Sequence, residues 1–88
     1  MALILKTNGT TEELNDLALT ALQQAVGGSI EGVRTRDHRL LYINEEGKLL
    51  GLPLNVQATV LYRNGAYDPI VGDAVLFTFE ETRAEREE

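Results

Sequence analysis

Three arginines and the only histidine of the chain fall within six consecutive positions, as Arg34, Arg36, His38 and Arg39. On a β-strand Arg34 and Arg36 would project from the same face, because side chains alternate between the two faces. A guanidinium group binds a phosphate or a carboxylate through two parallel hydrogen bonds. The spacing therefore indicates a site for an anion. The alternative is a solvated hairpin whose arginines pair with neighbouring carboxylates.

An aromatic side chain follows this cluster closely in the sequence. Tyr42 could stack on a nucleobase or line a groove, and the alternative is that it packs in the core or at an interface. We include Tyr42 among the candidate ligand contacts.

The overall charge limits the kind of anion. The formal net charge is −6 at pH 7, which opposes binding along the phosphates of a long nucleic acid. No apolar run approaches the roughly 20 residues that cross a bilayer. We therefore expect a soluble cytoplasmic protein that binds a small anion or an acidic partner surface, and neither long nucleic acid nor membrane.

No set of residues typical of an active site is present. Cysteine is absent, and Ser29, the only serine, lacks the glycines of a nucleophile elbow. A single histidine cannot supply the several imidazoles of a metal site. The acidic pairs are sequence neighbours and point apart on a helix or strand; they are Glu12/Glu13, Glu45/Glu46 and Glu80/Glu81. We expect no enzymatic activity, no metal and no cofactor.

The first half of the chain predicts a strand and then a long helix. Residues 2–6 are mostly aliphatic and lead to the turn signal Asn8-Gly9. Thr10 and Glu13 have the spacing of a capping box, and apolar residues recur at helical spacing from Leu14 to Val26. Gly27-Gly28 would end this helix, since glycine accepts the left-handed conformation that follows a helix.

The second half predicts short strands separated by turns. Strands are expected over residues 29–35 and 39–44, with Asp37-His38 as the turn between them. Residues 40–43 are continuously apolar, which indicates a strand covered on both faces or lying against a partner subunit. Residues 45–48 and Asn64-Gly65 read as turns. Residues 56–62 could form a short helix capped by Asn55 or a strand, and residues 74–79 a last strand.

These elements predict an α+β fold in which a small antiparallel sheet carries one main helix on one face, with a second short helix as an option. We expect a single domain over residues 1–79. A charged C-terminal tail over residues 80–88 would be frayed or helical. A chain of 88 residues without cysteine often gains stability by oligomerisation, so we expect a homo-oligomer.

The segments "VGGSIEGV", "LLYINEEGKLLGLPLNVQAT" and "PIVGDAVLF" occur in this order within the chain. Between Gly27 and Phe77 the sequence resembles a family of short bacteriophage and bacterial proteins known only as a domain of unknown function, the 3846 family. The resemblance implies a phage setting inside a host cell and carries no catalytic residues. Asn44 and Asn55 match its pattern, either as turn and cap residues or as part of a loop that closes over a ligand.

Two functions are therefore expected. The first is an oligomeric phage-type accessory module that binds an anionic small ligand, such as a nucleotide signal of host defence, and so sequesters it. The second is an acidic inhibitor that occupies the basic site of a host protein. The candidate ligand-binding residues are Arg34, Arg36, His38, Arg39, Tyr42, Asn44 and Asn55.

Overall fold

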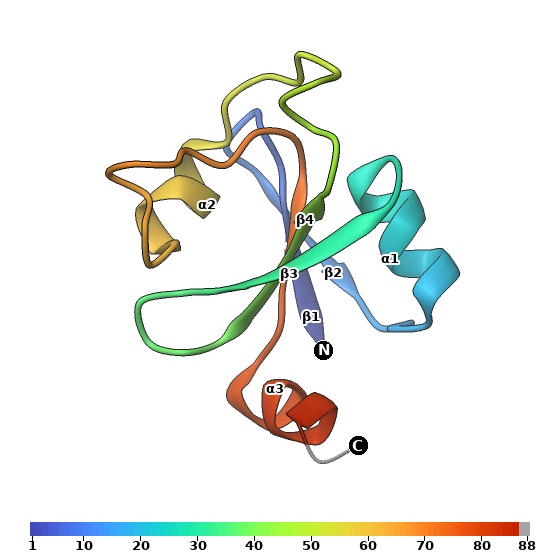
Figure 1. Cartoon of the computed structure of the whole chain (residues 1–88). Helices are drawn as coiled ribbons and strands as arrows, with labels where there is room; N and C mark the ends of the chain where they lie inside the picture. The colour runs from blue at the N-terminus through green and yellow to red at the C-terminus, as the bar shows by residue number, and fades with distance from the viewer. Residues whose placement is uncertain (87–88) are drawn as a thin grey trace.

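A computed structural model describes residues 1–86 and contains one five-stranded antiparallel sheet, in the order β2-β1-β5-β4-β3 (Figure 1). The strands are β1 (Ala2–Leu5), β2 (Thr11–Leu14), β3 (Ile30–Arg34), β4 (Leu40–Asn44) and β5 (Ala74–Leu76). The helices are α1 (Leu19–Val26), α2 (Val56–Leu61) and α3 (Phe79–Arg86). The predicted α+β class is confirmed.

Each face of the sheet carries its own apolar core, because alternate side chains of every strand point to opposite faces. On one face Leu22 and Val26 of α1 pack with Val75 of β5 and with Phe77, which follows that strand. On the other face Ala58 of α2 packs with a second set that includes Leu41. The two helices lie on opposite sides of the strands (Figure 1). The continuous apolar run of β4 is thus explained by a sheet covered on both faces.

The predicted helix is too long at its start. Residues 11–14 form strand β2, which pairs with β1 in a register that places Thr11 opposite Leu5. A tight turn causes this, since Gly9 has φ +90° and its N–H donates to the carbonyl of Lys6. The capping box between Thr10 and Glu13 is therefore wrong, and helix α1 begins only at Leu19.

The end of α1 and the start of α2 agree with the sequence. Gly27 has φ +81° and its N–H donates to the carbonyl of Gln23, as a glycine at a helix C-terminus does. The side chain of Asn55 accepts a hydrogen bond from the N–H of Ala58, so residues 56–61 form the helix of the two options.

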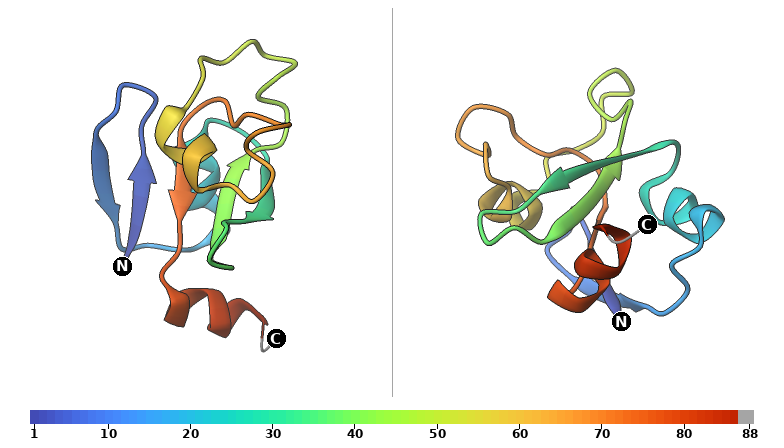
Figure 2. Two further views of the ribbon diagram at one scale, coloured as in Figure 1. Left: turned by 90° about the vertical axis from the view of Figure 1, so that its left-hand side faces the viewer. Right: turned by 60° about the horizontal axis from the view of Figure 1, so that its bottom comes forward.

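The C-terminal segment is helical from Phe79, so the predicted strand over residues 74–79 is too long. Thr78 and Glu81 form a capping box: the hydroxyl of Thr78 accepts from the Glu81 N–H at 3.1 Å, and the carboxylate of Glu81 accepts from the Thr78 N–H at 2.9 Å. Helix α3 lies beyond one end of the sheet, close to the N-terminus (Figures 1 and 2). It takes up most of the predicted tail, and residues 87–88 lie outside the described part.

Within residues 1–86 no helix has the length and apolar character that crossing a bilayer requires.

Candidate functional site

The connection between β3 and β4 is a tight hairpin turn. The N–H of Thr35 donates to the carbonyl of Arg39 at 2.9 Å, and the N–H of His38 donates to the carbonyl of Thr35 at 3.0 Å. His38 is the one residue other than glycine with a positive φ, +71°, within residues 1–86. The predicted turn at Asp37-His38 is present, and it exposes the side chain of His38.

Arg39 is neutralised within this turn. Its Nε lies 3.1 Å from both carboxylate oxygens of Asp37, and its Nη2 lies 3.0 Å from one of them. The hydroxyl of Thr35, a residue buried beneath the turn, also donates to Asp37. Hydrogen bonds from Arg39 and then from Thr35 hold the pKa of Asp37 below its ordinary value. Arg39 is therefore fixed in place and its charge is largely compensated.

The segment after α2 brings a further arginine to the turn. The backbone N–H of Arg63 donates to the carbonyl of Arg34 at 3.1 Å, next to an isolated bridge between Thr35 and Tyr62. Nη2 of Arg63 lies 2.5 Å from Nδ1 of His38. Since a guanidinium group has no acceptor, His38 accepts through that nitrogen.

Arg34 and Arg36 have different environments. Nη1 of Arg34 is buried and has no hydrogen-bond partner within residues 1–86. Strand β3 ends at Arg34, and Arg36 lies beyond it with an exposed side chain while its backbone N–H donates to Leu61. Of the predicted arginines, Arg36 is therefore the most accessible to another molecule.

Helix α3 closes one side of the turn. A cleft of about 190 Å³ is lined by His38, Phe79, Thr82 and Arg83. The guanidinium carbon of Arg39 lies 5.3 Å from the centre of the Phe79 ring, within the range of a cation–π contact. We call this region the arginine end. It holds five of the eight lysines and arginines of the chain, namely Arg34, Arg36, Arg39, Arg63 and Arg83.

The sequence interpretation missed the contributions of Arg63, Phe79 and Arg83. The capping box at Thr78 would have predicted α3 and so a helix that carries Arg83. No sequence signal indicates that Arg63 lies beside His38, because this contact depends on the bridge between distant segments.

The other three predicted residues lie away from the arginine end. The ring of Tyr42 packs edge-to-face on Phe77, with centroids 5.1 Å apart, in the core beneath α1. Asn44 is buried and donates to the carbonyl of Val26 at 3.0 Å. Asn55 is fully buried and donates to the carbonyls of Leu5 and Gly72. The two asparagines hold the backbone together in this structure.

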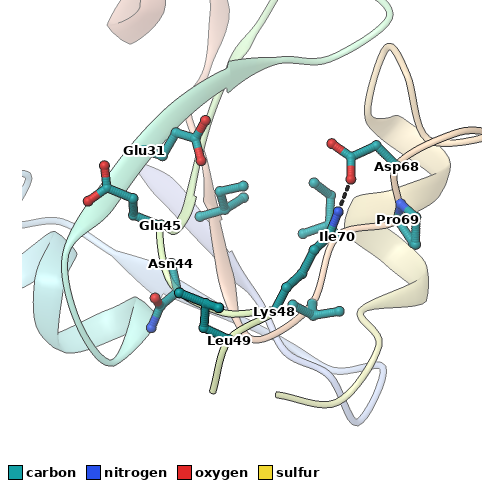
Figure 3. Close-up of a pocket in the computed structure, with 10 residues that line it drawn as sticks. Glu31, Asn44, Glu45, Lys48, Leu49, Asp68, Pro69 and Ile70 are labelled. Carbon is teal, nitrogen blue, oxygen red and sulfur yellow. Dashed lines mark hydrogen bonds and ion pairs between the residues drawn. The ribbon is translucent and has the colours of Figure 1, made fainter. Parts of the chain in front are cut away.

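A second pocket lies at the opposite end of the β3–β4 hairpin (Figure 3). We call it the acidic pocket. Its volume is about 130 Å³, and it is lined by Glu31, Ile43, Asn44, Glu45, Lys48, Leu49, Asp68, Pro69, Ile70 and Val71. Lys48 and Asp68 form an ion pair on one side, and Glu31 and Glu45 stand on the other (Figure 3).

No group of three or more histidine, aspartate or glutamate side chains within residues 1–86 is placed to hold a metal ion.

The chain belongs to the family described as a domain of unknown function (DUF3846), whose model matches residues 1–86. The match covers both ends of the hairpin and helix α3, and so extends beyond the segment that carries the resemblance in the sequence. The chain matches no curated protein and no solved structure.

Proposed function

We propose that the protein is a non-enzymatic binding module that holds a small anion at the arginine end. The observation that carries this proposal is that arginines from three separate segments lie around the β3–β4 turn in a chain of net charge −6: Arg39 belongs to the turn, Arg63 contacts His38 and Arg83 lines the cleft with His38. Asp37 bonds to Arg39. Arg36 is exposed and Nη1 of Arg34 has no hydrogen-bond partner within residues 1–86, so positive charge is available to a ligand.

The electrostatics of the arginine end favour an anion. Like charges held close together repel one another, and an anion between them converts repulsion to attraction. The buried Nη1 of Arg34 adds to this, because a buried donor without an acceptor costs about 1–3 kcal/mol. An oxyanion that reaches this nitrogen would remove that cost.

The cleft favours a nucleotide among small anions. Phe79 lines it and has an exposed ring, on which a base can stack, while Arg83 and the Arg63–His38 pair can hold phosphate groups. A cleft of about 190 Å³ suits one small ligand and not a duplex. With the phage setting that the family resemblance implies, a nucleotide signal of host defence in the cytoplasm of the host cell is our proposed ligand.

A thermal-shift screen with inorganic phosphate, cyclic dinucleotides and ADP-ribose tests this function. We expect at least one of them to raise the unfolding temperature. Arg63→Gln and Arg83→Gln should each weaken binding by about tenfold or more, since a hydrogen bond to a charged group contributes about 1.5–3 kcal/mol.

Lys6→Gln is the matched control, because Lys6 pairs with Glu12 and Asp73 away from the arginine end. The proposal fails if none of these compounds stabilises the protein. It also fails if Lys6→Gln weakens binding as much as the two arginine variants do.

A further inference from the structure

The acidic pocket contains two carboxylates without a counter-charge. Glu31 lies opposite Ile43 in the β3–β4 register, and Glu45 follows Ile43 by two positions, so both flank that residue on the same face. Such diagonal neighbours are about 7–8 Å apart in antiparallel sheets. Neither carboxylate has a hydrogen bond or ion pair from its side chain within residues 1–86, and Lys48, the one cation that lines the pocket, bonds Asp68. The pocket therefore favours an added cation.

The remainder of the pocket is apolar. Ile43, Ile70 and Val71 line it, and Ile70 is almost fully buried. A volume of about 130 Å³ equals that of roughly four water molecules at about 30 Å³ each, which is space for one long side chain. Arginine and lysine combine an apolar stem with a charged head, and they lay the stem along apolar surface. The occupant that fits both features is a basic side chain.

The surface around the pocket is also typical of a protein interface. Leu49, which lines the pocket, is 87% exposed, and Leu50 and Tyr67 in the same part of the chain are 59% and 92% exposed. Large apolar side chains beside a charged rim mark surfaces that bind another protein.

We propose that a second copy of this chain occupies the acidic pocket and inserts Arg36 between Glu31 and Glu45. The charge complementarity is present within the chain itself, because the arginine end and the acidic pocket lie at opposite ends of one hairpin. Arg36 is exposed in the connection between β3 and β4, and its side chain has no partner within residues 1–86. The contact joins different surfaces of the two copies, so it either occurs twice about a two-fold axis, with each Arg36 in the other copy's pocket, or repeats head to tail in a ring or open chain.

This inference rests on the same arginine end as the proposed function, but the two carboxylates belong to it alone. Sedimentation velocity at rising protein concentration tests it. We expect the wild-type chain to self-associate. The variants Glu31→Lys/Glu45→Lys and Arg36→Glu should each lower the association constant by about tenfold or more, because close charge pairs at interfaces couple by more than about 1.4 kcal/mol.

Mixing the two variants gives the decisive result. The Glu31→Lys/Glu45→Lys variant has a basic pocket, and the Arg36→Glu variant has a carboxylate at position 36. The two charges attract each other, so the mixture should associate although neither variant does alone. Glu13→Lys/Glu46→Lys makes the same change of charge at two exposed glutamates outside the pocket and should associate like the wild type. The neutral Glu31→Gln/Glu45→Gln variant repeats the test without adding charge.

The inference is overturned if the wild type stays monomeric at every concentration. It is equally overturned if the variants associate normally, or if their mixture does not associate, which would assign the pocket to a different protein. The Glu31→Gln/Glu45→Gln variant keeps all five arginines. The thermal shift caused by a ligand reports on the anion site, and association reports on the self-docking. If this variant keeps the thermal shift but no longer associates, the two proposals can be tested, and can fail, separately.

Discussion

The hydroxyl of Thr82 accepts a hydrogen bond from the backbone N–H of Leu40 at 2.9 Å, and this bond attaches helix α3 to the first residue of strand β4. Both residues are buried. In the sequence Arg83 follows Thr82 and Arg39 precedes Leu40, and both arginines belong to the arginine end. This hydrogen bond, together with the Arg39–Phe79 contact and the ion pair between the N-terminus and Glu81, therefore holds α3 against the turn.

Thr82→Val should destabilise the protein by about 1–3 kcal/mol. Valine keeps the shape of threonine but leaves the N–H of Leu40 buried without an acceptor, and that group bears the desolvation cost. Urea unfolding measures the loss. Thr11→Val, at an exposed position of β2, is the control and should change stability by less than about 0.5 kcal/mol. Equal effects of the two substitutions would contradict the role of this bond.

Asn55→Ala should be more harmful than Thr82→Val, with a loss of about 2–4 kcal/mol. The Asn55 side chain is fully buried and makes three hydrogen bonds: it donates to the carbonyls of Leu5 and Gly72 at 2.7 and 2.9 Å and accepts from Ala58 at 3.0 Å. Alanine leaves all three groups without their partner. Chemical denaturation of this variant and of Asn64→Ala, an exposed asparagine, compares the two. A small loss at residue 55 would show that water replaces the side chain.

Acidification should lower the free energy of unfolding, partly because the carboxylate of Glu81 becomes protonated. Burial would raise the pKa of Glu81, but hydrogen bonds from the N-terminal ammonium and from the Thr78 N–H hold it below the ordinary 4.5. The unfolded chain therefore takes up this proton at a higher pH than the folded one. The contribution is complete above pH 4.5 and is lost as the pH falls through the lower folded pKa.

Unfolding free energies measured between neutral and acidic pH test this. Glu81→Gln should be less stable at neutral pH and should lose less on acidification, and acetylation of the Met1 amino group should act in the same direction. A pH profile that stays parallel to that of the wild type would exclude Glu81 as a source of the acid sensitivity.

Gly65→Ala should cost about 3 kcal/mol. A Cβ at this position would lie 2.1 Å from the carbonyl oxygen of Thr59, so the backbone of α2 or of the turn has to move. Gly51→Ala provides the comparison, because a Cβ at residue 51 would meet no other atom. Its only cost is the left-handed backbone conformation, φ +67°, which disfavours alanine by about 1 kcal/mol. Thermal unfolding of both variants should show the larger shift for residue 65.

Local signals predicted most of the fold, and competition between signals explains the errors. Gly27 and Asn55 act as predicted because a helix end requires a left-handed residue or a side-chain acceptor wherever the helix packs. The segment after Gly9 has both a helical pattern and a hairpin turn, and pairing with β1 decides in favour of the strand. Of the capping-box patterns at Thr10 and at Thr78, only the one at Thr78 starts a helix, because Thr10 lies in the hairpin turn.

The candidate site was predictable only where its residues are close in the sequence. Arg39 and His38 belong to one turn, so their proximity follows from local geometry. Arg63 and Arg83 reach the same place through the packing of α2 and α3, which no spacing in the sequence reveals. Arg39 also shows that a nearby acid, Asp37, can absorb a predicted binding charge.

The order of the strands places β2 and β3 at the two margins of the sheet. Each carries ionised side chains, Glu12 and Glu13 on β2 and Glu31 and Arg34 on β3. A foreign strand that added to either margin would have to desolvate these groups, which opposes growth of a continuous cross-β structure. The charged margins thereby disfavour amyloid-like aggregation, and they favour association between copies through side chains over backbone pairing.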